Sequence, residues 1–211
     1  MDERSLTVTA VRSVGPDSIA IDVETPDEFD AKPGQFVKLT LDIDGEAESR
    51  FYTISSPDVV DTFEMTVGID PDGAVAPHLA ELEAGDSVRI SGPFGSDYYE
   101  GEPRAILLAG GPGIGPAVGI AERALAAGND AAVVYRDHAP IHEDRLDALR
   151  ADGALVEVLD GDANLTDAVA EAAADGGQVF VYGFADFLDD AMLALETAGI
   201  DTEDAKVENF G

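Results

Sequence analysis

Two segments of the chain combine residue types that could bind a nucleotide cofactor. The first is the glycine-rich turn Gly110-Gly111-Pro112-Gly113-Ile114-Gly115-Pro116, which follows an apolar run and precedes a helical pattern. In that position, backbone N–H groups and the positive end of the helix can face a pyrophosphate, and the missing side chains allow close approach. The spacing is not a strict G-x-G-x-x-G motif, so a tight turn without a ligand also explains this segment.

The second segment is Arg50-Phe51-Tyr52-Thr53-Ile54, which alternates like a β-strand. Alternation would place Arg50, Tyr52 and Ile54 on one face. A guanidinium beside an aromatic ring can bind a phosphate while the ring stacks on a planar cofactor, and the threonine offers a hydroxyl to a ring nitrogen. Taken alone, the segment is also compatible with an ordinary barrel strand that turns Arg50 and Tyr52 outward.

The elements that must position these segments change character near residue 100. Before it, short β-branched runs are separated by turn sequences such as Pro33-Gly34 and Asp44-Gly45. Strands are expected at Leu6–Val14, Ser18–Val23, Gln35–Leu41, Phe51–Ser55, Phe63–Ile69 and Ser87–Ile90, with a short helix near Pro77–Leu82. Several short strands at this spacing indicate a β-sandwich or a β-barrel.

After residue 100, uniformly apolar strands alternate with helical windows. Strands are expected at Ala105–Ala109, Ala131–Tyr135, Leu155–Leu159, Val179–Tyr182 and Ala205–Phe210, and helices at Pro116–Ala127, Glu143–Ala151, Leu165–Ala174 and Phe187–Ala198. Strands that are apolar throughout are typical of a parallel sheet covered by helices on both faces. The prediction is therefore an antiparallel β-barrel domain over residues 1–100, followed by a five-stranded, doubly wound α/β domain over residues 101–211.

The composition excludes several classes of function. The sequence carries 44 acidic and 12 basic residues, a formal net charge of -32, which makes nucleic-acid binding very unfavourable. It contains no cysteine, which excludes disulfides, cysteine-ligated zinc and a conventional iron–sulfur cluster held by this sequence. His138 and His142 stand four residues apart, but Pro140 interrupts the helical spacing that would let them share a metal ion, so no metal site is predicted.

The spread of the acidic residues along the chain favours adaptation to a salty cytoplasm, similar to that of proteins from halophilic archaea. An acidic docking face for a basic partner is the alternative, but it would require clustering. The N-terminal residues lack the basic and apolar regions of a signal peptide. The longest uncharged stretch, residues 105–121, is shorter than the roughly 20 residues of a membrane-spanning helix. A soluble, cytoplasmic protein without membrane insertion is expected.

A resemblance rests on several motifs that occur in one order. Arg50-Phe51-Tyr52-Thr53 is preceded by Pro33-Gly34-Gln35-Phe36-Val37 and followed by Gly85-Asp86-Ser87-Val88-Arg89-Ile90-Ser91-Gly92-Pro93-Phe94-Gly95 and then by the glycine-rich turn. This ordered combination resembles the ferredoxin–NADP⁺ reductase superfamily over essentially the whole chain. The combination is much more specific than any single motif.

The resemblance implies an FAD cofactor, NADPH or NADH as substrate, and a role for each matching residue. Arg50 would bind the flavin diphosphate, Tyr52 would pack on the isoalloxazine ring, and Thr53 would lie beside flavin N5. Glu208 would line the hydride-transfer site and Phe210 would shield the flavin, so Thr53, Glu208 and Phe210 are the candidate catalytic residues. The other expected cofactor contacts are Phe51, Val67, Gly68, Ile69, Val75, Ala76, Gly110, Gly111, Gly113, Arg136, Tyr182, Gly183 and Phe184.

Three positions depart from the family pattern. Ala76 stands where relatives place a serine or threonine that binds the pyrophosphate, although FAD stays favoured over FMN. Tyr182 replaces a cysteine in the nicotinamide pocket. Phe210 is followed by Gly211, so Glu208 and Phe210 are also compatible with an ordinary final strand. The pair Arg136-Asp137 leaves the choice of nucleotide open, because arginine suits a 2′-phosphate and aspartate a free ribose diol.

The function that the resemblance implies is hydride transfer from NAD(P)H to N5 of FAD, with electrons passed to a separate acceptor such as ferredoxin or another redox subunit. Two alternatives remain open. One is a non-catalytic flavin- or nucleotide-binding subunit of a larger redox complex. The other is a structural protein of the same fold that has lost its cofactor, for which Ala76 and Tyr182 are the best arguments.

Overall fold

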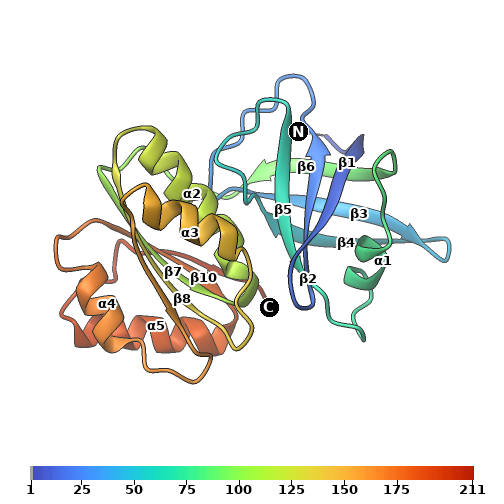
Figure 1. The fold of residues 1–211 in the computed structure, drawn as a ribbon. Coiled ribbons are helices and arrows are strands. Elements are labelled where there is room, and N and C mark those ends of the chain that lie inside the picture. The colour runs from blue at the N-terminus through green and yellow to red at the C-terminus, as the bar shows by residue number, and fades with distance from the viewer. Residues whose placement is uncertain (1) are drawn as a thin grey trace.

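The computed structural model describes residues 2–211 as two sheets that lie side by side (Figure 1). The strands of the first sheet are β1 (Arg4–Gly15), β2 (Ser18–Glu24), β3 (Phe36–Ile43), β4 (Glu46–Thr53), β5 (Thr62–Gly68) and β6 (Ser87–Phe94), and the helix α1 (Ala76–Ala80) lies between β5 and β6 in the chain. All pairings in this sheet are antiparallel, in the order β4-β3-β6-β1-β2-β5. Its inner side chains form one apolar core, which includes Val37, Leu39, Ile54, Phe63 and Met65.

The first sheet is barrel-like and not closed. Its two edge strands, β4 and β5, approach each other just after β4 ends, where Ile54 bridges Met65 and the Ser55 N–H donates to the Glu64 carbonyl oxygen (2.8 Å). Strand β4 begins at Glu46, earlier than the predicted Phe51. The reason is the two-residue turn Asp44-Gly45, whose positive φ angles (53° and 88°) make a tight hairpin, so that pairing with β3 starts directly after it.

The second sheet is parallel and has helices on both faces. Its strands are β7 (Arg104–Gly110), β8 (Asp130–Arg136), β9 (Leu155–Leu159), β10 (Gln178–Gly183) and β11 (Lys206–Asn209), in the order β11-β10-β7-β8-β9. A 3₁₀ turn at Gly111–Gly113 leads into α2 (Ile114–Ala126), and the other helices are α3 (Glu143–Ala151), α4 (Thr166–Ala172) and α5 (Ala185–Thr197). Figure 1 shows α2 and α3 on one face and α4 and α5 on the other. The predicted fold class is confirmed.

The strand order of the second sheet reverses at β7, which has β8 on one side and β10 on the other. In open parallel sheets, ligands bind outside the carboxyl ends of the strands at such a reversal. The glycine-rich turn follows β7 at this point, and the end of β11 lies beside the end of β10. None of the helices within residues 2–211 combines the length and apolar character that a membrane span requires.

A polar seam joins the two domains, and Arg145 of α3 lies at its centre. The guanidinium of Arg145 donates to Glu64 of β5 (2.8 Å), to both carboxylate oxygens of Glu122 of α2 (2.7 Å each) and to the Ser55 carbonyl oxygen (2.8 Å). Arg12 of β1 binds the other oxygen of Glu64 (2.8 Å). These contacts cross from the barrel to two helices of the α/β domain, so they restrain how the two sheets face each other.

Two glycines of α2 let the backbone of this helix approach the barrel directly at the same seam. A methyl group at Gly119 would lie 2.6 Å from the carbonyl oxygen of Ser55, and one at Gly115 would overlap the Thr66 hydroxyl. The sequence therefore needs glycine at both positions for packing between the domains.

Candidate functional site

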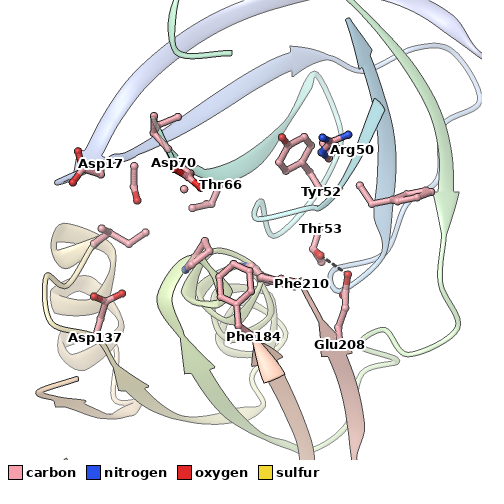
Figure 2. A pocket seen from close by; sticks show the side chains of 18 of the residues that line it. Asp17, Arg50, Tyr52, Thr53, Thr66, Asp70, Asp137, Phe184, Glu208 and Phe210 are labelled. Atoms are coloured by element: carbon pink, nitrogen blue, oxygen red, sulfur yellow. Dashed lines mark hydrogen bonds between the residues drawn. The ribbon is translucent and has the colours of Figure 1, made fainter. Parts of the chain in front are cut away.

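A cleft of about 700 Å³ lies between the barrel and the carboxyl ends of the parallel strands (Figure 2). Barrel residues and α/β residues contribute to its wall in similar numbers. The residues that line it are Pro16, Asp17, Ser18, Ser49, Arg50, Phe51, Tyr52, Thr53, Thr66, Gly68, Ile69, Asp70, Pro112, Pro116, Asp137, Ala139, Ile141, Phe184, Glu208, Asn209, Phe210 and Gly211. Its size lies within the range of small-molecule and cofactor sites, about 300–1,000 Å³.

The end of strand β4 forms one wall of the cleft. Arg50 is half-exposed, donates to the Ser49 carbonyl oxygen (2.7 Å) and lies 3.6 Å from a Glu48 carboxylate oxygen. Tyr52 is partly buried, and this burial raises its pKa to about 12, so its hydroxyl stays neutral. Ile54, expected on the same face, points into the barrel core instead of lining the cleft. The wall therefore presents a guanidinium and a neutral phenol ring side by side (Figure 2).

Thr53 and Glu208 meet across the cleft from different domains. The Thr53 hydroxyl donates to a carboxylate oxygen of Glu208 at 2.7 Å, and Figure 2 shows this bond between the end of β4 and β11. Burial raises the pKa of Glu208 to about 7; the bond from Thr53 opposes this shift, and Asp97 adds to it. A carboxyl group with this pKa holds or releases a proton near neutral pH, which is the property of a proton donor or acceptor.

Two phenylalanines form the aromatic part of the opposite wall. The rings of Phe184 and Phe210 pack edge to face, with centroids 6.3 Å apart, and Phe184 is 51% exposed. The Phe210 N–H donates to the Gly183 carbonyl oxygen (3.0 Å), which holds Phe210 beside the end of β10. An exposed phenylalanine at the mouth of a cleft offers apolar surface to a planar ligand.

The turn after β7 needs glycine for two reasons: steric overlap with neighbouring residues at Gly110 and Gly113, and a positive φ angle at Gly111. A methyl group at Gly110 would overlap the Phe187 ring, and one at Gly113 would overlap the Tyr182 backbone. Gly111 has a φ of +56°, in the left-handed region that favours glycine. The residues of this turn that line the cleft are Pro112 and Pro116.

Several expected site residues lie outside the cleft wall. Val75 and Ala76 lie at the start of α1 and pack against the barrel core, as does Val67 of β5. Tyr182 is 1% exposed in the core of the α/β domain, and its hydroxyl has no hydrogen-bond partner among the described residues. Arg136 is turned toward α5. In contrast, Gly68 and Ile69 line the cleft together with Arg50, Phe51, Tyr52, Thr53, Phe184, Glu208 and Phe210.

Sequence reasoning missed two carboxylates and a buried polar contact at the cleft. Asp17 and Asp70 belong to turns that carry no chemical motif, whereas Asp137, which follows β8, was already singled out beside Arg136. The Nε2 atom of His142 lies 2.8 Å from the Thr66 hydroxyl oxygen, which in turn lies 2.9 Å from the Ser55 hydroxyl oxygen. Burial, with smaller contributions from Arg145 and Arg12, lowers the pKa of His142 to about 3, so this histidine is neutral and joins the domains.

The residues of the cleft fit a flavin. Arg50 is the one cationic side chain among its described lining residues, and it stands next to the Tyr52 ring, as a phosphate and an aromatic ring system of one ligand would require. Thr53 adds a hydroxyl beside them, and Phe184 and Phe210 add apolar surface. A methyl group at Gly68 would meet Pro112 at 3.7 Å, an ordinary van der Waals contact, so the two sides of the cleft approach each other closely at this point.

Residues 5–99 match the protein family described as the oxidoreductase FAD-binding domain. The chain is 44% identical over 97 residues to the glycine betaine monooxygenase reductase subunit of Chromohalobacter salexigens, which covers 44% of this chain and 26% of that protein. It is 28% identical over 153 residues to the toluate 1,2-dioxygenase electron transfer component of Pseudomonas putida, which covers 68% of this chain and 45% of that protein. The chain thus covers less than half of each of these relatives.

The fold is also that of a solved reductase. A ferredoxin NADP⁺ reductase from Neisseria gonorrhoeae, crystallised with bound FAD and NADP, superimposes with a TM-score of 0.81, at 18% identity and with 100% of both chains covered. At that identity the likeness concerns the fold. The match to the FAD-binding domains of oxidoreductases comes from the sequence and concerns residues 5–99.

Proposed function

We propose that this chain is a member of the ferredoxin–NADP⁺ reductase superfamily and works as an NAD(P)H-dependent flavoprotein reductase that passes electrons to a separate acceptor. The observation that carries the proposal is the pair formed by Thr53 and Glu208 at 2.7 Å, next to Arg50 and Tyr52 in one interdomain cleft. A partly buried carboxyl group whose pKa is raised to about 7 is also typical of functional sites.

The barrel side of the cleft would hold the FAD. Arg50 would bind its diphosphate, because its half-exposed guanidinium keeps donors that neither Ser49 nor Glu48 occupies. Tyr52 would offer its ring face to the isoalloxazine, and Thr53 its hydroxyl to a ring nitrogen. When bound, FAD accepts a hydride from a reduced nicotinamide and can release the two electrons one at a time.

The α/β side of the cleft would exclude water from the space where hydride transfer occurs and would hold a proton there. Phe184 and Phe210 would exclude water from this space, since their packed rings line the same cleft as Glu208. Glu208 would hold a proton on its carboxyl group near neutral pH, with Thr53 fixing the orientation of that group. Thr53 therefore acts both on the flavin side and on the proton-holding side.

The acceptor is proposed to be another protein. The two relatives described above are named as a monooxygenase reductase subunit and as a dioxygenase electron transfer component, and this sequence has no cysteine to hold an iron–sulfur cluster of its own. A ferredoxin or an oxygenase component is therefore the proposed recipient. A salty cytoplasm would reduce the repulsion between this chain and an acidic partner.

The test is reconstitution of the purified chain with FAD, followed by anaerobic mixing with NADH or NADPH in a stopped-flow spectrophotometer. Bleaching of the flavin absorbance supports the reductase. A yellow protein that neither nucleotide bleaches would favour a non-catalytic flavin-binding subunit, and a chain that rejects FAD would overturn the proposal. In Thr53→Ala, flavin should stay bound while its reduction slows; an unchanged rate would reject the role of Thr53.

A further inference from the structure

We propose that the α/β end of the cleft selects NADH over NADPH, with Asp137 as the residue that recognises the adenosine ribose. The inference rests on the proposed function and adds the choice of nucleotide to it. The order of residues alone leaves the choice open, because Arg136 and Asp137 are adjacent and suit opposite ligands. The surroundings of the two side chains are very different.

Asp137 lies at the edge of the cleft in a fixed orientation. One of its carboxylate oxygens accepts a hydrogen bond from the Ala139 N–H (2.8 Å), and the other accepts one from the Tyr135 hydroxyl (3.1 Å). Figure 2 shows the carboxylate turned toward the barrel side of the cleft. A carboxylate oxygen has room for a second donor, so Asp137 can still accept hydrogen bonds from two ribose hydroxyls.

The position of Asp137 matches that of a ribose-binding acid. It follows β8, the strand next to β7, and a methyl group at Gly111 would lie 3.9 Å from its carboxylate oxygen. The carboxylate thus borders the glycine-rich turn that would face the pyrophosphate. In doubly wound nucleotide-binding domains, an acidic residue at this place binds the 2′-hydroxyl of NAD, and an arginine nearby accommodates the 2′-phosphate of NADP.

The Arg136 side chain makes its contacts outside the cleft. Its guanidinium binds Asp190 of α5 (2.8 Å), donates to the Ala163 carbonyl oxygen (3.2 Å) and lies over the Phe187 ring (5.3 Å to the centroid). Its side chain is 13% exposed, and it does not line the cleft. A 2′-phosphate would have to displace these three contacts before Arg136 could bind it.

The negative charge at this end of the cleft also disfavours binding of a 2′-phosphate. Asp17 and Asp70 line the barrel side opposite Asp137, and Figure 2 places all three carboxylates at the end of the cleft away from Arg50. A 2′-phosphate carries up to two negative charges, whereas a ribose hydroxyl carries none. The same geometry that lets Asp137 accept from a hydroxyl therefore repels the phosphate.

The test measures binding of the adenosine half alone, so that its result does not depend on turnover. Isothermal titration calorimetry of the FAD-loaded chain uses ADP-ribose and 2′-phospho-ADP-ribose as probes, at one fixed high salt concentration. We expect ADP-ribose to bind about tenfold more tightly or better, the difference that one charge-assisted hydrogen bond supplies. Asp137→Asn should reduce that preference to less than about threefold, and Asp189→Asn, an exposed charge-matched control on α5, should leave it unchanged.

Two further variants keep the test decisive if Asp137→Asn folds poorly. Arg136→Gln should leave the affinity for 2′-phospho-ADP-ribose unchanged, because Arg136 does not face the probe. Asp190→Asn should raise that affinity, because it removes the main partner of Arg136 and frees its guanidinium. Tighter binding of 2′-phospho-ADP-ribose by the wild type, lost in Arg136→Gln, would overturn the inference and leave the reductase proposal intact. If the wild type binds neither probe and neither nucleotide reduces its flavin, both proposals fail.

Discussion

Replacement of Glu208 by glutamine should make the stability of the protein less sensitive to rising pH. Burial between the two domains raises the pKa of this carboxyl group from an ordinary 4.5 to about 7. The folded state therefore prefers the protonated form. Glutamine is close in shape to a protonated glutamic acid and can still accept the hydrogen bond from Thr53.

The sign follows from the two pKa values. Below pH 4.5 the group is protonated in the folded and unfolded states, and burial costs nothing through ionisation. Between pH 4.5 and about 7 the folded state keeps a proton that the unfolded state releases, so stability falls as the pH rises. Above pH 7 the full cost remains, at most about 3 kcal/mol, because the partly exposed side chain lets water stabilise the charge.

The assay is urea unfolding of the wild type and of Glu208→Gln from pH 4 to pH 8 at one salt concentration. The difference in unfolding free energy should grow in favour of the variant between about pH 4.5 and 7 and then level off. Glu203→Gln, an exposed glutamate in the same C-terminal segment, is the matched control and should show no such slope. Parallel pH profiles for wild type and Glu208→Gln would show that this carboxyl group titrates normally and would refute the reasoning.

Three other perturbations test the seam and the charge of the chain. Arg145→Met should lower the unfolding free energy by about 3 kcal/mol, because it leaves Glu64 and Glu122 without their shared partner. The control Arg150→Met lies on the same helix and breaks an exposed ion pair, so it should lower the unfolding free energy by less than about 1 kcal/mol. Equal losses for the two variants in urea titrations would contradict this prediction. The pKa of His142 is lowered to about 3 in the folded state, so the wild type loses stability as the pH falls from about 6.5 to 3. His142→Asn should lose less stability over this pH range. An acid unfolding curve that the substitution leaves unchanged would count against a buried neutral histidine. Thermal melts in sodium chloride should show a melting temperature that rises most steeply below about 0.5 M, where screening of the net charge of -32 changes fastest; a flat or falling curve would argue against charge repulsion.

The order and type of the elements could be predicted because the signals are local. A period-two pattern with turn sequences gives the barrel, and uniformly apolar strands between helical windows give the parallel sheet. The error in the start of β4 came from Glu46–Ser49, a polar stretch without the alternation of a half-buried strand. Its pairing with β3 depends on the hairpin turn before it, and backbone hydrogen bonds do not require apolar side chains.

The candidate site could be predicted only where its residues belong to recognisable segments. Arg50, Tyr52 and Thr53 form such a segment, and Glu208 was found through the family pattern of the last strand. The choice between Arg136 and Asp137 could not be read from the sequence, because Asp190, more than fifty positions later, decides where the guanidinium goes.

The seam lay beyond sequence reasoning for the same physical reason. Arg145 and His142 contact residues of β5 and its preceding loop, far away in the chain, and nothing in the local pattern distinguishes these two side chains from surface residues. Burial and long-range pairing give them their properties. Only the packing of one domain on the other brings the partners together.

The glycines at positions 115 and 119 have a consequence for the construction of chimeric proteins of this fold. Since α2 touches the corner between β4 and β5 through bare backbone, a transplanted α/β domain with alanine at either position would tilt its new barrel outward. Helix α2 and the corner between β4 and β5 should therefore be exchanged together. A swap that moves both should keep the mouth of the cleft in shape, and a swap at the linker alone should widen it.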